Sequence, residues 1–333
     1  MKRLAVYFTA PYTVEVRQEW LPSPGVGQVV VETRVSAISP GTELLFYRGQ
    51  APTDLPVDET ISALAGDVRF PIKYGYSAVG RVIELGADVS ADWQGRLVFC
   101  FNPHESHFVA ALADLMPVPL TLSPEEAAFL PNMETAVNLL MDGQPLIGEQ
   151  VAVFGQGIVG LLTAALLAQF PLARLVTLDP YALRRDKSLD IGSHISLDPT
   201  QAAQLHELLP DGADLAYELS GNPAGLDQAI ATTGFNGRVV VGSWYGRKPA
   251  TLNLGGRFHR SRIRLISSQV SSIASEWTGR WTKSRRFQTA WQMIEHVKPA
   301  GLITHRCPIG QAAEAYALLD QHPEQAVQVM LTY

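Results

Sequence analysis

The sequence predicts an α/β protein that combines a β-rich domain with a doubly wound parallel sheet. The first third of the chain carries short runs of β-branched residues separated by Gly and Pro, which is typical of strands and tight turns. From about residue 131, short apolar strands alternate with helical stretches, as in a parallel sheet with right-handed crossovers. The length of 333 residues is enough for two hydrophobic cores.

Residues 1–130 form the predicted β-rich domain. The first strand is residues 4–8, and we do not interpret it as a signal peptide because its apolar run is too short. Residues 26–35 and 78–85 cluster β-branched side chains and predict two further strands. Glycines and prolines between these runs indicate the turns of a compact, barrel-like domain.

Residues 131–270 form the predicted parallel-sheet domain. A helix at 158–169 lies between strands at 151–154 and 175–178. Later strands are expected at 215–219, 238–241 and 263–266. Residues 271–333 form a C-terminal segment, with helices expected at 287–297 and 310–319 and a closing strand at 327–331.

The composition excludes several classes of protein. Charged residues make up 17% and apolar residues 47%, as in globular proteins, and the net charge of −6 argues against a nucleic-acid partner. Cys100 and Cys307 form no C-x-x-C pair, so we exclude a cysteine-rich zinc site and expect reduced thiols in the cytoplasm. The most apolar stretch, residues 158–170, is too short to span a bilayer, so we expect no membrane association.

The strongest motif is G-x-G-x-x-G, spelled Gly155-Gln156-Gly157-Ile158-Val159-Gly160. It directly follows a predicted strand and opens a predicted helix, which is the context of a dinucleotide-binding loop. Gly155 permits the tight turn, Gly157 lets the backbone approach a pyrophosphate, and Gly160 lets the helix pack on the strand. The N–H groups at the start of the helix would then bind the phosphates in this Rossmann arrangement.

Asp179 ends the next predicted strand and indicates which nicotinamide cofactor binds. A carboxylate there accepts hydrogen bonds from the ribose hydroxyls and repels a 2′-phosphate, which favours NAD over NADP. Arg184 and Arg185 follow closely, and either could instead turn toward a 2′-phosphate. NADP therefore stays the alternative.

The strand–GQGIVG–helix–Asp arrangement behind a β-rich domain resembles the medium-chain dehydrogenase/reductase superfamily, which includes the zinc alcohol dehydrogenases. The similarity covers essentially the whole chain and extends to Glu218-Leu219-Ser220-Gly221-Asn222, where relatives read E-A-T-G-N. It implies a GroES-like catalytic domain built from the N-terminal part and the tail. It also implies hydride transfer between nicotinamide and a small-molecule substrate.

The resemblance further assigns cofactor contacts outside the glycine loop. Thr135 matches a threonine that touches the nicotinamide. Ser220 and Gly221 belong to the loop under the adenosine ribose and nicotinamide side. Ser243 and Trp244 follow the strand that contacts the carboxamide.

The zinc ligands of the superfamily are replaced in this chain. Where relatives read C-G-T-D, this sequence reads Pro40-Gly41-Thr42-Glu43, so the cysteine ligand becomes Pro40, or Ser39 if the turn shifts by one. Relatives then read G-H-E, whereas this chain has Gly75-Tyr76-Ser77. The third ligand falls near Pro131. Proline has no donor atom for zinc, so we expect no metal.

Without a metal, a side chain must exchange the proton with the substrate oxygen. Thr42 occupies the proton-relay position of the superfamily, and the Tyr76 phenol stands where a ligand histidine would point at the reaction centre. His104 is a general acid–base candidate because histidine as a residue type changes its charge near neutral pH, although a lone loop histidine is often a surface residue. Glu43 and Glu134 are expected to orient these groups or to be structural. Tyr76 has the alternative of filling the vacated metal site.

A basic stretch toward the C-terminus has several interpretations and does not identify the substrate. Residues 257–286 are rich in arginine and include Lys283, Trp277 and Trp281, with Glu276 as the one acidic residue. This pattern fits an anionic, flat or sugar-like substrate, and it fits a solvated helix face or a subunit contact slightly better. The Pro-Gly-Thr-Glu and Gly-Tyr motifs also resemble those of bacteriochlorophyllide hydroxyethyl dehydrogenases, which take a large anionic macrocycle.

Three functional alternatives stay open. We expect an alcohol/carbonyl oxidoreductase. A zinc-free quinone or enone reductase is the alternative within the enzymes, and a non-catalytic NAD(H)-binding protein is the alternative outside them. The non-catalytic protein would be favoured if Thr42, Tyr76 and His104 lay far apart. By analogy with relatives that pair their parallel sheets edge to edge, we expect a homodimer.

Overall fold

The computed structural model describes residues 1–58 and 61–333, and it divides into two compact units. Met1–Pro131 and Lys298–Tyr333 form unit 1, and Asn132–Val297 forms unit 2. The first expected boundary, after residue 130, lies beside the observed one. The second, expected after residue 270, is corrected to Val297 because the helix Lys283–Val297 packs on the helix Ile158–Leu167 of unit 2.

Unit 1 is built on a mixed sheet with the strand order β14-β15-β3-β4-β5-β7, and β6 also pairs with β3. A separate hairpin joins β1 and β2. The strands are β1 (Lys2–Ala10), β2 (Thr13–Trp20), β3 (Gln28–Ala37), β4 (Ala78–Leu85), β5 (Leu97–Cys100), β6 (His107–Ala111), β7 (Leu115–Pro117), β14 (Ile303–Pro308) and β15 (Gln328–Thr332). The helices are α1 (Pro40–Tyr47), α2 (Pro124–Ala127) and α9 (Ala312–Gln321). This confirms the β-rich character of the N-terminal part.

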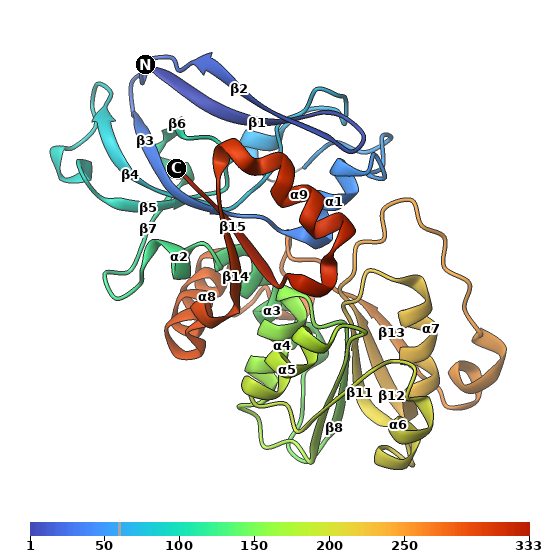
Figure 1. The fold of residues 1–333 in the computed structure, drawn as a ribbon. Coiled ribbons are helices and arrows are strands. Elements are labelled where there is room, and N and C mark those ends of the chain that lie inside the picture. Colours follow the sequence, from blue (N-terminus) through green and yellow to red (C-terminus); the bar gives the residue numbers. More distant parts are fainter. Residues whose placement is uncertain (59–60) are drawn as a thin grey trace. The chain divides into compact units, whose positions relative to one another are not determined.

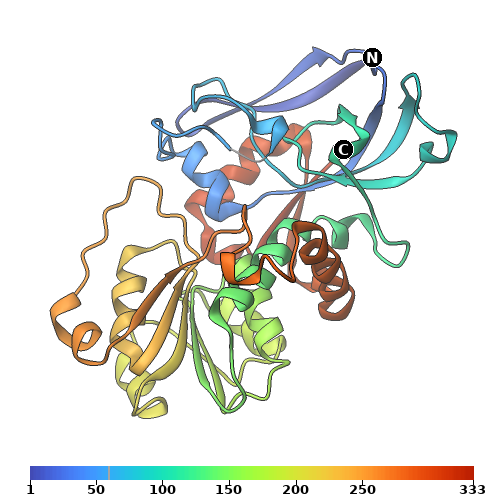
Figure 2. The same cartoon turned by 180° about the vertical axis from the view of Figure 1, so that it is seen from behind.

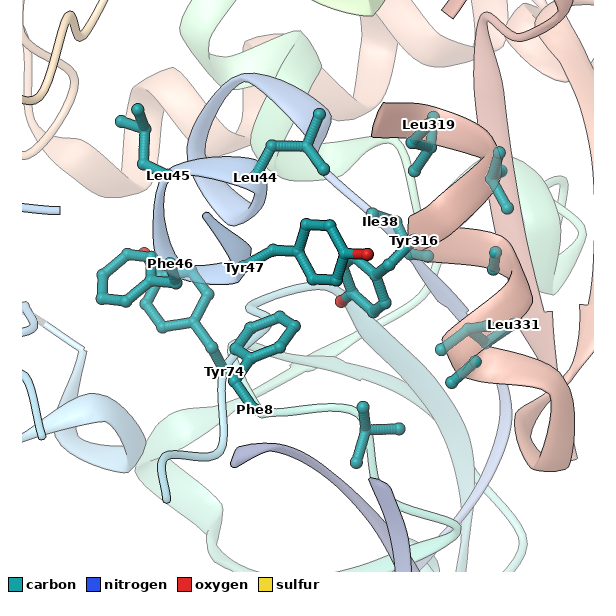
Figure 3. Packing of buried hydrophobic residues seen from close by; sticks show 14 of the residues in the cluster. Phe8, Ile38, Leu44, Leu45, Phe46, Tyr47, Tyr74, Tyr316, Leu319 and Leu331 are labelled. Atoms are coloured by element: carbon teal, nitrogen blue, oxygen red, sulfur yellow. The ribbon is translucent and has the colours of Figure 1, made fainter. Parts of the chain in front are cut away.

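The C-terminal segment contributes to the same sheet as the N-terminal part. β15 pairs antiparallel with β3, and β14 pairs parallel with β15. α9 packs against α1, and side chains of both helices belong to the aromatic core drawn in Figure 3. In this core Phe46 stacks on Tyr74 with ring centres 3.8 Å apart. Two chain parts that are far apart in sequence therefore close into one core.

Unit 2 holds a parallel sheet with the order β10-β9-β8-β11-β12-β13. Figure 1 shows α4 and α5 on one face of this sheet and α6 and α7 on the other. The strands are β8 (Gln150–Phe154), β9 (Arg174–Leu178), β10 (Ile195–Leu197), β11 (Ala213–Glu218), β12 (Thr233–Val241) and β13 (Arg264–Ser267). The helices are α3 (Leu130–Gly143), α4 (Ile158–Leu167), α5 (Ala182–Asp190), α6 (Ala202–Leu208), α7 (Pro223–Thr232) and α8 (Lys283–Val297). The predicted doubly wound parallel sheet is thus confirmed.

Candidate functional site: a nucleotide crevice and a buried polar network

The order of the strands in unit 2 indicates where a ligand would bind. β8 has β9 on one side and β11 on the other, so the strand order reverses at β8 (Figure 1). In a sheet of this kind, ligands bind beyond the carboxyl ends of the strands at the point of reversal. The loops that begin after Phe154 and Glu218 therefore form the expected binding edge.

The glycine loop is tightly packed at both ends and open in its middle. Gly155 has a φ of +91°, and a Cβ there would lie 2.5 Å from the Cα of Ser220. A Cβ on Gly160 would lie 1.9 Å from the carbonyl oxygen of Gly155. Gly157 is the N-cap of α4 and has no capping side chain, and a Cβ at this position would meet nothing within 4 Å. The open space beside the first helical N–H groups fits the pyrophosphate of a dinucleotide.

The residues between these glycines are held in the loop. Gln156 is fully buried, and its side-chain amide donates a 3.0 Å hydrogen bond to the carbonyl of Gly155. Ile158 is buried at the start of α4, and Val159 is partly buried against the core. These side chains fix the start of α4 and are turned into the protein. The backbone groups of the loop therefore make the contact with a ligand.

Asp179 closes the glycine loop from the end of β9. One carboxylate oxygen accepts the Gln156 N–H at 2.7 Å, and the other accepts the Tyr181 N–H at 3.0 Å. Burial raises the pKa of Asp179, and Arg184 at 3.8 Å opposes that shift. A carboxylate has about four acceptor positions, so two remain for ribose hydroxyls.

The two arginines behind Asp179 are engaged within the protein. The Arg184 guanidinium lies 4.9 Å from the centre of the Tyr181 ring. Arg185 donates to the carbonyl of Asp179 at 2.8 Å. Both contacts hold the arginines at the turn that follows β9.

A buried carboxylate joins the loops that follow β11 and β12. Glu218 is fully buried and accepts the Ser220 N–H at 2.9 Å, together with the hydroxyls of Ser220 and Tyr245. The Gly221 N–H donates to the Ser243 hydroxyl at 2.8 Å. Tyr245 was not among the residues predicted from the sequence, because no motif marks it.

The remaining predicted cofactor residues of unit 2 lie around the same edge. Thr135 is half-buried on α3, and Trp244 follows β12 with 41% of its surface exposed. Glu134, beside Thr135, is buried and bonded to Arg286 at 2.8 Å. Glu134 is therefore bound by an arginine inside unit 2.

In unit 1, the catalytic candidate Tyr76 lies in a cluster of hydroxyl groups. The hydroxyls of Ser39 and Thr42 donate hydrogen bonds to the Tyr76 phenol oxygen. Burial, and after it the nearby Glu43 carboxylate, raise the pKa of Tyr76 to about 12. The phenol is therefore protonated at neutral pH, and two hydroxyl donors are in place to stabilise a phenolate.

Glu43 and His104 form a fully buried pair. One Glu43 oxygen lies 3.0 Å from His104 Nε2 and accepts the Tyr316 hydroxyl at 2.5 Å, while the other accepts the Ser39 N–H at 2.7 Å. His104 Nδ1 lies 2.6 Å from the Ser36 hydroxyl. The expectation of a surface loop histidine is therefore wrong, because both ring nitrogens are bonded inside the protein.

The buried pair belongs to a longer polar network. The Ser36 hydroxyl also lies 2.6 Å from the phenol oxygen of Tyr333. Tyr316 on α9 packs edge-on against Phe8 at 5.0 Å and stacks with Tyr47 at 5.8 Å (Figure 3). The sequence gives no sign of these partners, since they come from segments almost 300 residues apart and match no motif.

The donor set of unit 1 does not fit zinc. Pro40 begins α1, Tyr76 is bound by hydroxyls, and Pro131 is buried and has no side-chain donor. Within the described part of the chain, no group of three or more His, Cys, Asp or Glu side chains is arranged to hold a metal ion. Thr42, Tyr76, Glu43 and His104 do lie together in unit 1, instead of being dispersed.

The basic stretch does not form a single anion site. Arg286 is fully buried, and Arg257 donates to the carbonyls of Thr233 at 2.7 Å and Asp211 at 3.2 Å. Arg280 and Arg285 are exposed and lie over the rings of Trp277 and Trp281, at 5.1 and 4.2 Å. The anionic-substrate interpretation of this stretch therefore does not hold for Arg257 and Arg286, whose donors are used by the protein.

The proteins that this chain resembles include several dehydrogenases. A family model described as "Zinc-binding dehydrogenase" matches residues 159–295. The chain is 27% identical to the uncharacterized zinc-type alcohol dehydrogenase-like protein YphC of Escherichia coli K12, with 95% of each chain covered. It is 24% identical to D-guloside 3-dehydrogenase of the same organism, covering 92% of this chain and 93% of the relative. The structure of an alcohol dehydrogenase from Escherichia coli CFT073, solved with NADH, has the same fold, with a TM-score of 0.80 and 16% sequence identity. The match covers 100% of this chain and 99% of that chain.

Proposed function

We propose that the chain is a nicotinamide-dependent oxidoreductase of the medium-chain dehydrogenase/reductase superfamily, and that it oxidises an alcohol, or reduces its carbonyl, with NAD. The observation that carries the choice of NAD is the buried Asp179 carboxylate at the glycine loop. Its negative charge repels a 2′-phosphate and leaves acceptor positions for ribose hydroxyls. NADP is the alternative cofactor.

The glycine loop and the loops after β11 and β12 bind and orient the cofactor in this proposal. The first turn of α4 presents N–H groups to the pyrophosphate, beside the open space at Gly157. Glu218 fixes the loop that carries Ser220, and Ser243 fixes Gly221. A nicotinamide cofactor held by these residues would supply hydride transfer to or from the substrate carbon.

We assign the proton exchange to the Tyr76 phenol. In carbonyl reduction the phenol donates its proton to the developing alkoxide, and in alcohol oxidation the phenolate accepts it. The Ser39 and Thr42 hydroxyls stabilise the phenolate by donating hydrogen bonds to its oxygen. His104 is too deeply buried to reach a substrate, so it and Glu43 act as positioning residues that hold α1 and its hydroxyl Thr42.

We propose that the reaction is zinc-independent. The support is the donor set: proline stands at two of the positions that hold zinc ligands in relatives, and tyrosine at the third. Proline offers no donor, and a zinc site requires three or four. Metal analysis of the purified protein tests this directly, since one equivalent of zinc that is retained and needed for turnover would overturn the proposal.

The substrate we propose is a secondary alcohol of a sugar-like compound, carrying a negative charge in some cases. One relative is named D-guloside 3-dehydrogenase, which supports a carbohydrate alcohol as the first class to screen. Arg280 and Arg285, stacked on Trp277 and Trp281, supply the aromatic and cationic surface that such a substrate would use. An alternative role of this surface is a subunit contact.

We also propose a cytoplasmic homodimer with small-molecule partners and no nucleic acid. β13 is an edge strand of the parallel sheet, and its Leu265 is 38% exposed. A second copy could extend the sheet along this edge by backbone pairing. No helix in the described residues is long and apolar enough to cross a membrane. Light scattering on the purified protein and on Leu265→Asp tests the assembly.

The deciding experiment has two steps. Titration with NADH and NADPH, followed by tryptophan fluorescence, should show tighter binding of NADH. A screen of sugar alcohols, quinones and enones with the bound cofactor should then show turnover of the first class, and Tyr76→Phe should lose most of that turnover at unchanged NADH affinity. Turnover of only quinones or enones favours a reductase, and NADH binding without any turnover favours a non-catalytic protein.

A further inference from the structure

A single buried guanidinium joins three parts of unit 2. Arg286 of α8 is fully buried and is the largest fully buried side chain among the described residues. Its Nε and Nη2 atoms donate to Glu134 at 3.0 and 2.8 Å. Nη1 donates to the Asn138 amide oxygen at 2.5 Å and to the Ser272 carbonyl at 3.0 Å, and Nη2 also donates to the Val270 carbonyl.

These contacts use every N–H donor of the guanidinium. Arginine has five donors, and the five hydrogen bonds end on α3 and on the segment that follows β13. Burying an ion pair costs desolvation free energy, so a pair of this kind is weak evidence for stability and better evidence for a fixed geometry. The geometry that Arg286 fixes is the position of residues 270–272 against α3.

A second set of bonds ties the same segment to α3. Asn138 donates to Asp142 at 2.9 Å and to the Ser268 hydroxyl at 3.0 Å. The Ser268 hydroxyl donates to Asp142 at 2.6 Å. Figure 2 lets the reader follow the segment from the end of β13 to α8, past α3. Residues 268, 270 and 272 are thus held by side chains of α3 and α8, although they lie outside the strands and helices.

The held segment lies at the binding edge of the sheet. β13 is parallel to β12, so its carboxyl end at Ser267 lies at the edge from which the glycine loop and the loops after β11 and β12 leave. On α3, Thr135 adjoins the Glu134 that Arg286 binds. Arg286 itself has no exposed atom, so it acts on a ligand only through these neighbours.

We propose that Arg286 is a positioning residue that shapes the nicotinamide end of the cofactor site by fixing residues 268–272 against α3. The proposal rests on the proposed function, because it presumes that unit 2 binds a nicotinamide dinucleotide. A purely structural ion pair would affect all ligands of unit 2 equally. A positioning residue at one end of the site affects only the ligand that occupies that end.

The test compares NADH with ADP-ribose, which lacks the nicotinamide ring and keeps the adenosine and pyrophosphate. Arg286→Met alone would strand the Glu134 carboxylate in the core, so the main variant is Arg286→Met with Glu134→Leu. Arg286→Lys is the second variant, because lysine keeps the charge beside Glu134 and lacks the planar fork that reaches both carbonyls. Binding of each ligand is measured by isothermal titration calorimetry.

A matched control lies at the opposite edge of the same sheet. Arg238 forms a two-point pair with Glu149 at 2.7 Å and donates to the Gly143 carbonyl at 2.6 Å. Both side chains are nearly buried, with 11% and 12% exposed. The double variant Arg238→Met with Glu149→Leu therefore removes a similar ion pair from the amino ends of β8 and β12, away from the binding edge.

The expected result is a split between the two ligands. The Arg286 double variant should bind NADH about tenfold more weakly and ADP-ribose within about twofold of the original protein. A roughly tenfold change in affinity is usual when one site of a protein influences binding at another. Arg286→Lys should show the same split in smaller measure, and the Arg238 double variant should show none. Equal weakening of both ligands, or no change in either, would overturn the proposal. If the original protein binds neither ligand, the proposed function fails first.

Discussion

Substitution by alanine should affect nucleotide binding at one glycine of the motif and protein stability at another. Gly157 has φ −67° and ψ −176°, which any residue adopts, and a Cβ there meets no atom within 4 Å. Gly160 is the third glycine of the motif, and its Cβ would lie 1.9 Å from the backbone oxygen of Gly155. We expect Gly157→Ala to fold and lose nucleotide binding, and Gly160→Ala to lose stability.

The magnitudes follow from these contacts. In Gly160→Ala a backbone oxygen must move by about 1 Å or more, and such overpacking costs about 1–3 kcal/mol, against a gain of about 1 kcal/mol in helix propensity. We expect a net loss near the upper end, about 2 kcal/mol. Alanine at the N-cap position of Gly157 should cost at most about 1 kcal/mol. Its methyl group would displace a phosphate from one or two charge-assisted hydrogen bonds, which corresponds to a roughly 10–100-fold weaker Kd, on the order of 1.4–2.8 kcal/mol.

The assay is urea unfolding without nucleotide, together with NADH titration of each folded variant. The loop reasoning is refuted if Gly157→Ala binds NADH as tightly as the original protein. It is equally refuted if Gly160→Ala unfolds at the same urea concentration as the original. Gly41→Ala is a control for the NADH titration only, since its Cβ also meets nothing within 4 Å and it lies in unit 1.

The other predictions concern single side chains. Asp179→Ser should raise NADPH affinity relative to NADH, measured by parallel titration, and unchanged discrimination would remove Asp179 from cofactor selection. His104→Ala should lower the free energy of unfolding by about 3 kcal/mol because it leaves buried partners unbonded, whereas Tyr76→Phe should change turnover and hardly stability. The Arg306 hydrogen bond lowers the pKa of Glu125, so this pair stabilises above the ordinary pKa of 4.5 and is lost as pH falls. Arg306→Met should therefore cost under about 1 kcal/mol at about pH 7 and nothing near pH 2, measured by urea unfolding at both.

Local sequence patterns were sufficient to predict strands of the sheets and the glycine loop. The strand at residues 78–85 and the helix beginning at Ile158 agree with β4 and α4, because short apolar runs with Gly boundaries adopt these structures in most contexts. The loop residues are adjacent in sequence, so their spacing alone indicates the binding geometry. Unit boundaries were harder: α8 belongs to unit 2 because its buried face meets α4, which no local signal reveals.

His104 can be identified as an acid–base candidate from the sequence, but its burial between Ser36 and Glu43 is visible only in the folded chain. The same holds for Arg286, which looked like one of several surface charges and proved to be the buried tie between α3 and residues 270–272. The fold class and the dinucleotide loop follow from the sequence, since both depend on neighbours along the chain. The polar networks are made by side chains up to about 300 residues apart, and only folding brings such partners within hydrogen-bonding distance.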